Sequence, residues 1–373
     1  NRVMLQKFDR YLLKKLDQPF FIFNKKKLIK QINLFKNHFN GKILYAVKAN
    51  PSQFIISLLA KNGLNAFDTA SLKEVKLIKD IVPNAEIFFM NPVKSRNAIK
   101  EAYFKYDVKN FALDSFDELH KIIEATNRSK KINLHLRIKI KNDSSIINLS
   151  KKFGVEEKNT YTLLKSLRKY SYKIGLCFHV GSQCMCPKSF KVAMDISRKI
   201  VEKSNVDISF LNIGGGFPSN YPGLKSLPLK DYFRVINKNF KKININPNNV
   251  ILLAEPGRSL VCESMSMIVK VELRKRNKLY INDGIYGHLN NAGLKNFNYP
   301  VKLFNRKEKL SKLMPFSLFG PTCDSSDFIK GPFFLPDSIN EGDWIEIKQM
   351  GAYTTSMQTD FNGFSNKIKV FDL

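Results

Sequence analysis

A lysine at the end of an apolar stretch is the first residue in this sequence that could carry out chemistry. Lys48 follows the segment Lys42 to Val47 and precedes Ala49, Asn50 and Pro51. This order predicts a strand with the amine at its open end. There a lysine can form a Schiff base with an aldehyde, once burial or a neighbouring cation lowers its pKa. In a chain with 62 Lys and Arg residues, a solvated strand end is the alternative interpretation.

A run of glycines and an arginine form a candidate phosphate site. Gly214-Gly215-Gly216 follows one apolar stretch, and Arg258 lies three residues after Glu255, which follows another. Glycines let backbone N–H groups approach an anion closely, and a guanidinium can bind phosphate through two hydrogen bonds. Without the arginine, the glycines would be equally compatible with a tight turn.

Glu255 and His179 extend this set of residues. A lysine that takes an aldehyde and a loop that takes a phosphate match the two ends of pyridoxal phosphate. The pyridine nitrogen of that cofactor needs a carboxylate to stay protonated while the ring accepts electrons, and Glu255 can supply it. His179 can stack on the ring face, and it can also be a histidine of the core.

The elements that must position these residues alternate between short apolar runs and helical patterns, as in βα units. Eight strands are expected, at Ile43–Val47, Asn65–Phe67, Glu86–Met90, Asn110–Leu113, Ile132–Ile140, Gly175–Phe178, Ile208–Ile213 and Val250–Ala254. Helices are expected at Pro51–Lys61, Ser71–Ile81, Ser95–Lys105, Ser115–Thr126, Thr160–Tyr170, Pro187–Lys203 and Lys230–Phe240. Ser71 with Glu74, and Ser115 with Glu118, fit the capping box of a helix start.

This alternation predicts an α/β fold, a (β/α)8 TIM-like barrel, whose chemistry gathers at the carboxyl ends of the strands. The polar residues expected at those ends are Lys48, Asp68, Asn91, Asp114, His179, the glycine run and Glu255, with Arg137 inside the fifth strand. After Glu255, short strands between Gly, Pro and Asn turns predict a second, all-β domain. Its strands are expected at Met265–Val271, Leu279–Ile281, Val301–Leu303, Pro315–Phe319, Trp344–Ile347 and Ile368–Phe371, with Pro19–Phe23 pairing to them. We expect the barrel at residues 25–262 and the β domain, a sandwich or small barrel, at 1–24 plus 263–373.

Composition narrows the class of protein. The sequence has neither a signal-peptide pattern nor an apolar run of the roughly 18 residues that a membrane span needs, so we expect a cytoplasmic protein without a membrane partner. Five scattered cysteines favour reduced thiols, and Cys184 and Cys186 lack the companions that a metal site requires, so no metal is expected. The net charge of +30 is spread along the chain, and we therefore expect no nucleic-acid partner.

The order of six motifs resembles that of the fold-type III pyridoxal-phosphate decarboxylases, which have an alanine-racemase-like barrel and include eukaryotic-type ornithine decarboxylase. These motifs are Tyr45-Ala46-Val47-Lys48, His179-Val180-Gly181-Ser182, Gly214-Gly215-Gly216-Phe217-Pro218, Glu255-Pro256-Gly257-Arg258, Gly320-Pro321-Thr322-Cys323-Asp324 and Gly351-Ala352-Tyr353. A seventh segment, Phe361-Asn362-Gly363-Phe364, carries the likeness to near the end of the chain.

The resemblance implies a role for each matched residue. Lys48 would be the Schiff-base lysine, His179 would stack on the cofactor, and Glu255 would pair with its pyridine nitrogen. Around the phosphate it implies Ser182, Gly214, Gly215, Gly216, Arg258 and Tyr353, with Asp68 and Arg137 in a supporting network. It also implies a homodimer in which Cys323, Asp324 and Phe361 reach the site from the other subunit. Cys323 would protonate the product, and Asp324 would bind the distal amine of the substrate.

The resemblance favours L-ornithine as the substrate, which would give putrescine for polyamine biosynthesis. Related diaminopimelate decarboxylases typically carry glutamate after the cysteine, whereas this chain has Asp324. The ornithine-type enzymes have a second acidic residue after the motif at 282–287, and the segment 288–295 contains none. Lysine, arginine and diaminopimelate therefore remain alternative substrates, and a non-catalytic regulator with the same fold is the alternative from another class.

Overall fold

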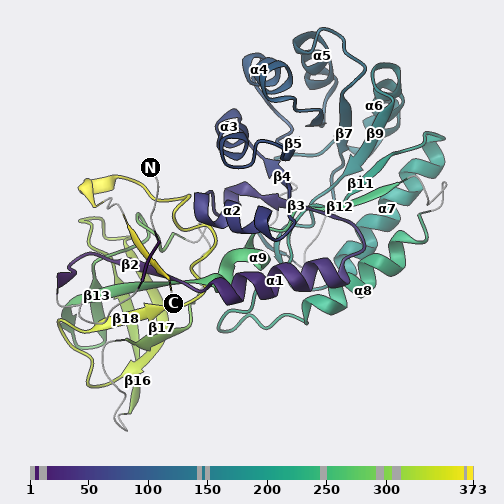
Figure 1. Ribbon diagram of the computed structural model, residues 1–373. Coiled ribbons are helices and arrows are strands. Elements are labelled where there is room, and N and C mark those ends of the chain that lie inside the picture. The colour runs from purple at the N-terminus through teal and green to yellow at the C-terminus, as the bar shows by residue number, and fades with distance from the viewer. Residues whose placement is uncertain are drawn as a thin grey trace.

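The structure is a computed structural model that describes residues 5–7, 15–140, 145–147, 152–243, 250–290, 298–304, 312–364 and 368–372. Part of the segment in which no second acid was found, residues 291–295, lies outside this range. Two bodies lie side by side in it, a barrel ringed by helices and a smaller β domain (Figure 1).

Eight parallel strands close into a barrel in the order β11-β12-β3-β4-β5-β6-β7-β9, so the expected (β/α)8 fold is confirmed. Their bounds are β3 Lys42–Ala46, β4 Ala66–Thr69, β5 Glu86–Phe89, β6 Asn110–Leu113, β7 Asn133–Arg137, β9 Lys173–Cys177, β11 Phe210–Asn212 and β12 Ile251–Ala254. Two details differ from expectation. Asp68 lies inside β4 rather than after it, and Arg137 is the last residue of its strand rather than an interior one.

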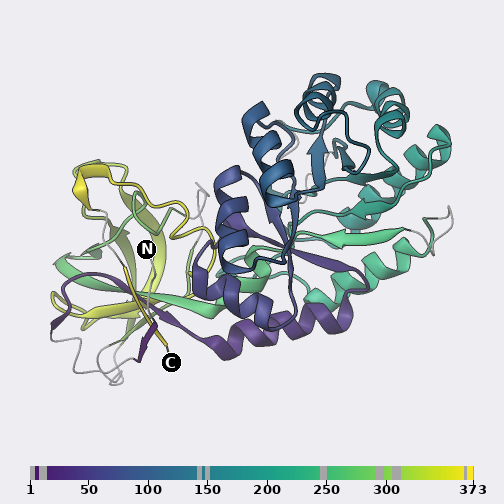
Figure 2. The same cartoon turned by 45° about the horizontal axis from the view of Figure 1, so that its top comes forward.

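Helices cover the outside of the barrel (Figures 1 and 2). They are α1 Lys25–His38, α2 Gln53–Lys61, α3 Leu72–Ile81, α4 Arg96–Tyr106, α5 Phe116–Ala125, α6 Glu157–Tyr170, α7 Lys188–Ser204, α8 Leu229–Phe240 and the short α9 Arg258–Val261. Each of the seven expected helices is present, with bounds that shift by a few residues. The helix α1 was not expected, and it leads from the β domain into the barrel.

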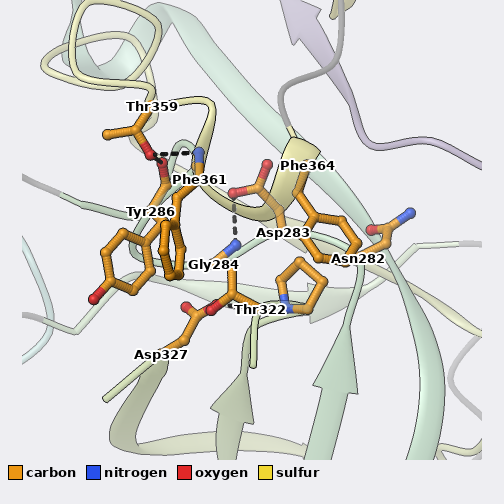
Figure 3. A pocket seen from close by; sticks show the side chains of 11 residues that line it. Asn282, Asp283, Gly284, Tyr286, Thr322, Asp327, Thr359, Phe361 and Phe364 are labelled. Carbon is orange, nitrogen blue, oxygen red and sulfur yellow. Dashed lines mark hydrogen bonds between the residues drawn. The ribbon is translucent and has the colours of Figure 1, made fainter. Parts of the chain in front are cut away.

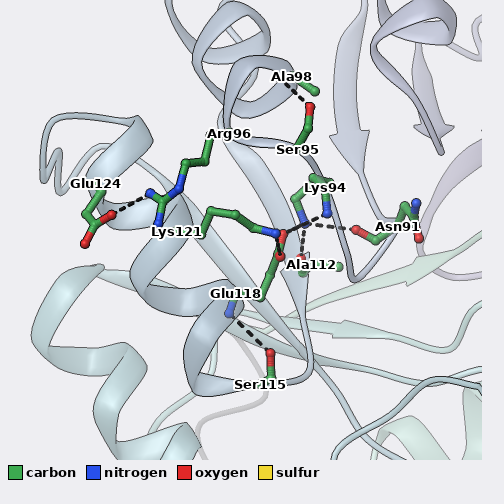
Figure 4. Close-up of polar contacts among 10 residues, drawn as sticks. All are labelled: Asn91, Lys94, Ser95, Arg96, Ala98, Ala112, Ser115, Glu118, Lys121 and Glu124. Carbon is green, nitrogen blue, oxygen red and sulfur yellow. Dashed lines mark hydrogen bonds and ion pairs between the residues drawn. The ribbon is translucent and has the colours of Figure 1, made fainter.

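In both expected capping boxes, the hydrogen bond of the serine side chain is confirmed. Ser71 and Ser115 accept the backbone N–H of Glu74 and Glu118, as an N-cap side chain should. Glu118 does not reach back to its own cap. Its carboxylate is buried, and it accepts the backbone N–H of Lys94 at 3.1 Å and lies 3.0 Å from Lys94 Nζ (Figure 4). The side chain therefore fastens the loop after β5 to the start of α5.

The inside of the barrel is a packed core rather than a pore. A cluster of buried side chains fills it, formed by Leu44, Ala66, Phe88, Met90, Ala112, Cys177, Phe210 and Leu253. His135 lies in this interior without solvent exposure, near Asn110 Oδ1 at 3.2 Å, and burial lowers its pKa to about 3. Such a filled interior gives the strand ends a rigid base.

The second domain is built on one large sheet. The order of neighbouring strands in this sheet is β1-β19-β2-β13-β14-β16-β17. In addition, β18 pairs with β13, and β15 pairs with β18. Their bounds are β1 Leu5–Lys7, β2 Phe20–Phe23, β13 Met265–Lys275, β14 Lys278–Ile281, β15 Val301–Leu303, β16 Leu313–Phe319, β17 Phe328–Pro336, β18 Trp344–Ile347 and β19 Lys369–Asp372. The expected all-β domain is thus confirmed, and the N-terminal β2 pairs with β13 as expected.

Four strands were not predicted from the sequence, and the first of them is the N-terminal β1. β17 was missed because it contains Gly331 and Pro332, residues that weaken a strand pattern. Strands β8 Ser145–Ile147 and β10 Ser182–Cys184 form a small antiparallel pair outside the barrel. Within the described ranges, no helix is long and apolar enough to cross a membrane.

Candidate active site

Lys48 lies at the carboxyl end of the barrel beside a buried carboxylate. It belongs to a single turn, Val47–Ala49, that directly follows β3. Its Nζ is 3.3 Å from Oδ2 of Asp68, whose side chain is only 4% exposed. The carboxylate of Asp68 raises the pKa of Lys48 against the opposing effect of burial. The expectation of a lowered lysine pKa is therefore wrong, because the neighbouring anion outweighs desolvation.

Glu255 is the second buried acid of this site and follows β12. Burial, followed by the charge of Asp68, raises its pKa to about 7. Asn212 Nδ2 donates to Glu255 Oε1 at 2.6 Å, while Asn212 Oδ1 accepts the N–H of Gly214 at 2.9 Å. Asn212 thus joins the ends of two strands, a role that sequence reasoning missed. A polar residue at the end of an apolar strand was the available signal.

The glycine run is a place where side chains do not fit. Gly214 and Gly216 have φ of +66° and +94°, which favours glycine. A Cβ on Gly214 would collide with the carbonyl oxygen of Phe178, and one on Gly216 with that of Gly181. The run therefore lies against neighbouring backbone so closely that no side chain fits there.

His179 is held against this run in one orientation. Its Nδ1 accepts the N–H of Gly181 at 3.0 Å, so the imidazole presents an acceptor there. Burial lowers its pKa well below the ordinary value, and the charges of Arg137 and Lys48 lower it further. A Cβ on Gly215 would lie 3.2 Å from His179 Nε2. A neutral ring beside the glycine run can lie against an aromatic ligand without repelling Lys48.

Arg258 begins α9 and lies buried between two tyrosines. Its Nη1 donates to the hydroxyl of Tyr221 at 3.0 Å, and its Cζ is 4.8 Å from the centroid of the Tyr353 ring. Tyr353 comes from the β domain, and its N–H donates to the carbonyl of Ala49 at 2.8 Å, next to Lys48. The β domain therefore forms one wall of the site. Tyr221 was missed in the sequence.

Two further expected residues lie close by. Arg137 is half-buried, and its charge acts on both His179 and Glu255, which locates it among them. Ser182 is the first residue of β10, directly after Gly181. Lys48, Asp68, Arg137, His179 and Glu255 thus form one group of interacting titratable side chains. The glycine run, Arg258 and Tyr353 border this group.

Cys323, Asp324 and Phe361 form a separate group in the β domain. Oδ2 of Asp324 accepts the hydroxyl of Tyr286 at 2.6 Å, and Oδ1 accepts both the N–H and the hydroxyl of Ser326 at 2.7 and 2.8 Å. The bond from Tyr286 lowers the pKa of Asp324. Phe361 packs on Tyr286 with ring centroids 4.7 Å apart, and Cys323 is exposed. The contacts of this group with other described residues lie within the β domain.

The loop that carries Tyr286 is fixed by two buried acids. Asp327 accepts the N–H of Ile285 at 2.9 Å and the hydroxyl of Thr322 at 2.6 Å. Asp283 accepts the N–H of Gly284 at 2.8 Å (Figure 3), and its other oxygen lies 2.8 Å from His288 Nδ1. The motif at 282–287 was noted for a missing acid, and its role in holding this loop was not foreseen.

The donor set fits pyridoxal phosphate and does not suit a metal. An amine, a buried carboxylate, a neutral imidazole and a glycine run with a buried arginine match the aldehyde, the pyridine nitrogen, the ring face and the phosphate. Among the described residues, no three His, Cys, Asp or Glu side chains gather as metal ligands. The fold and the site together define the class, a barrel enzyme of fold type III that uses pyridoxal phosphate.

Comparison with known proteins agrees with this class. Residues 25–262 match the pyridoxal-binding domain of the pyridoxal-dependent decarboxylases. A lysine/ornithine decarboxylase of Selenomonas ruminantium is 30% identical over 96% of this chain and 91% of its own, and the Mus pahari ornithine decarboxylase is 33% identical over 86% and 73%. Antizyme inhibitor 2 of Xenopus laevis is 32% identical over 87% and 74%. The arginine decarboxylase of Paramecium bursaria Chlorella virus, solved with agmatine, superimposes with a TM-score of 0.86 at 26% identity, over 96% and 97% of the two chains.

The chain belongs to the pyridoxal-dependent decarboxylase family. It is a carboxy-lyase of fold type III with pyridoxal phosphate as its cofactor, in the group whose named members act on ornithine, lysine and arginine. Both the resemblance and the cofactor expected from the sequence are thereby confirmed.

Proposed function

We propose that this enzyme decarboxylates L-ornithine to putrescine and carbon dioxide. The observation that carries the proposal is Asp324, an anion whose orientation is fixed by Tyr286 and Ser326. A fixed carboxylate suits the distal ammonium of a basic amino acid and repels the distal carboxylate of diaminopimelate. Lysine and arginine carry the same kind of distal cation and remain the competing substrates. The relatives named for ornithine and lysine support this substrate class.

We assign the cofactor to the group of residues around Lys48. Lys48 would hold the aldehyde end, Glu255 the pyridine nitrogen, and His179 the ring face. The phosphate would be held by Ser182, Gly214, Gly215, Gly216, Arg258 and Tyr353. Asp68 and Arg137 set the charge around Lys48 and Glu255, because both act on the pKa values of these two groups.

When bound, pyridoxal phosphate supplies the electron sink for loss of the carboxylate. The residues of the chain supply the proton steps. Lys48 must lose a proton before its amine can act as a nucleophile, and Oδ2 of Asp68 is in contact with it. After carbon dioxide leaves, the former α-carbon of the substrate needs a proton, which the thiol of Cys323 would donate.

Cys323, Asp324 and Phe361 would act in the site of a second copy of the chain. Their contacts lie within the β domain, and Phe361 and Phe364 leave 40% and 48% of their surface exposed. Apolar rings exposed beside a thiol and a carboxylate suit burial against a partner. We therefore propose a homodimer with shared active sites. We also propose domain boundaries at 25–262 for the barrel, with 1–24 and 263–373 in the β domain, and a cytoplasmic location.

The direct test is carbon dioxide release from ornithine, lysine, arginine and diaminopimelate by the purified enzyme. We expect kcat/KM to be highest for ornithine. Asp324→Asn should lower kcat/KM for ornithine by about 10- to 100-fold, mainly through KM, because it removes a charge that pairs with the substrate. Asp337→Asn, which changes an exposed acid of the same domain, is the control. A preference for diaminopimelate, or an unchanged KM in Asp324→Asn, would contradict the proposal.

A non-catalytic regulator is the second candidate, since one relative is named an antizyme inhibitor. A regulator of this kind would release no carbon dioxide from any of the four amino acids while remaining folded. The intact set of Lys48, Glu255, Cys323 and the glycine run favours the enzyme.

A further inference from the structure

Behind the glycine run, the guanidinium of Arg258 is held by aromatic and thiol groups. Arg258 is 4% exposed, Tyr221 is 5% exposed and Cys262 is fully buried. Arg258 Nη1 donates to the hydroxyl of Tyr221 at 3.0 Å, and that hydroxyl lies 2.9 Å from the sulfur of Cys262. The Cys262 thiol in turn donates to the carbonyl of Gln349 at 3.3 Å. These contacts form a row of four groups that ends on the guanidinium.

The hydrogen-bonding capacity of each group fixes the direction of this row. Arg258 only donates, so the Tyr221 oxygen accepts from it and has one proton left to give. The thiol proton points to Gln349, so the sulfur of Cys262 is the acceptor of that tyrosine proton. Burial raises the pKa of both Tyr221 and Cys262, the latter to about 11, so both keep their protons at neutral pH.

The same row ties the arginine to the β domain. Gln349 precedes the turn in which the Gly351 N–H donates to the Cys262 carbonyl at 3.0 Å, and a Cβ on Gly351 would collide with the carbonyl oxygen of Val261. Two residues later, the Tyr353 ring lies 4.8 Å from the Arg258 Cζ. The position of the guanidinium is therefore set jointly by the barrel and by the segment that supplies the site wall.

We propose that Tyr221 and Cys262 are positioning residues that hold the Arg258 guanidinium in place for the phosphate of the cofactor. Tyr221 and Cys262 would not touch the phosphate themselves. The Tyr221 hydroxyl accepts a hydrogen bond from the guanidinium, and the sulfur of Cys262 accepts the proton of that hydroxyl. The inference rests on the proposed role of Arg258 in phosphate binding.

The test separates the phosphate from the rest of the cofactor. Dissociation constants of cofactor-stripped protein are measured for pyridoxal phosphate and for pyridoxal, which has the same aldehyde and no phosphate. We expect Tyr221→Phe to reduce the ratio of the pyridoxal constant to the pyridoxal phosphate constant about tenfold, the size of one hydrogen bond to a charged group, and to leave pyridoxal binding unchanged. Tyr103→Phe, which removes a tyrosine hydroxyl bonded to Ser129 on the outer helices, should leave the ratio at the wild-type value.

Cys262 provides a second pair of variants, which decide the matter if Tyr221→Phe does not fold. Cys262→Ala should lower the ratio by a few-fold, and Cys262→Ser, which keeps a donor and an acceptor, should restore it. A wild-type ratio in both Tyr221→Phe and Cys262→Ala, alongside a collapsed ratio in Arg258→Ala, would overturn the positioning role and leave the phosphate role of Arg258 intact. An unchanged ratio in Arg258→Ala would overturn both.

Discussion

At the residue scale, the site holds one ammonium and two buried carboxyl groups whose charges the cofactor is expected to balance. Lys48 is held as an ammonium beside Asp68, and Glu255 has a pKa of about 7 because it is buried near that same acid. A buried Asn212 amide donates a hydrogen bond to Glu255. Burial makes the ionised form of Glu255 costly for the folded protein, and a protonated ring nitrogen would offset that cost.

Glu255→Gln should stabilise the cofactor-free protein at alkaline pH. A carboxyl with a pKa of about 4.3 when unfolded and about 7 when folded loses stability as the pH rises through that interval, and the loss persists above it. We expect Glu255→Gln to gain about 1 to 3 kcal/mol over wild type at pH 8 and almost nothing near pH 4.5. Glutamine keeps the acceptor for Asn212. The measurement is the thermal unfolding midpoint against pH.

The exposed Glu272 supplies the control for this prediction, since Glu272→Gln should leave the pH profile unchanged. If Glu255→Gln lowered the midpoint equally at every pH, the raised pKa of Glu255 would be contradicted. The same substitution should abolish decarboxylation, so stability and activity are expected to move in opposite directions.

Sequence motifs identified the residues expected to touch the cofactor, such as Lys48 and Arg258. They did not identify the residues that act through these, such as Asn212 and Tyr221. Their side chains work by a contact across strands or loops, and a single sequence carries no record of which side chains meet. The sign of the Lys48 pKa shift was wrong for the same reason, because it depends on the distance to Asp68.

At the scale of elements, a buried ion pair fastens the loop after β5. Lys94 Nζ is fully buried, donates to the carbonyls of Asn91 and Ala112 at 2.9 and 2.5 Å, and pairs with Glu118 at 3.0 Å (Figure 4). Burial lowers its pKa to about 8. We expect Lys94→Met to destabilise the protein by about 3 kcal/mol, because it leaves Glu118 and two carbonyls without this donor. Chemical denaturation measures the loss.

A neighbouring surface pair is the matched control for Lys94. Arg96 and Glu124 are about 60% exposed, so Arg96→Met should cost less than about 1 kcal/mol. Glu118 also pairs with Lys121, so it keeps one cation in Lys94→Met, and the loss there comes from the Lys94–Glu118 pair and the two carbonyls. An equal loss of unfolding free energy in Lys94→Met and Arg96→Met would show that the buried pair does not stabilise the loop after β5.

The glycine run gives a second prediction about elements. Gly214→Ala should weaken pyridoxal phosphate binding at least tenfold, because its Cβ would collide with the Phe178 carbonyl and shift the loop. Gly223 also has a positive φ, of +77°, and a Cβ there meets nothing within 4 Å. Gly223→Ala therefore carries the backbone strain without the collision, and cofactor titration should find its affinity near wild type. Matching losses in the two variants would assign the effect to strain alone.

The elements were predictable where hydrophobic periodicity was undisturbed. All eight barrel strands follow from apolar runs, because a strand buried on both faces is apolar throughout. Strand β17 was hidden by Gly331 and Pro332, and the pair of β8 and β10 by its short length. The capping glutamate at 118 was misassigned because the box pattern contains no information about Lys94.

At the scale of the whole molecule, the two parts of the proposed site belong to different domains. Lys48 lies at the barrel mouth, whereas Cys323 and Asp324 make their contacts in the β domain. Sequence order alone could not give this arrangement, and the family resemblance supplied the homodimer as an expectation.

Two variants that are defective at ornithine concentrations well below KM should restore activity when their subunits are exchanged. Lys48→Ala lacks the lysine, and Asp324→Ala lacks the substrate carboxylate. A mixed dimer would retain one intact site, so random reassortment of equal amounts should return about a quarter of wild-type activity. Carbon dioxide release before and after exchange is the measurement. Activity that stays at the sum of the two separate variants would contradict shared sites.

The central claim is that Lys48 binds pyridoxal phosphate covalently and that this lysine is required for decarboxylation. Borohydride reduction of the holoenzyme, followed by peptide mass analysis and parallel carbon dioxide assays, tests it most directly. We predict that the reduced cofactor is found on the peptide containing Lys48, and that Lys48→Ala releases no carbon dioxide from ornithine. Cofactor fixed on another lysine, or a wild-type rate in Lys48→Ala, would contradict the account.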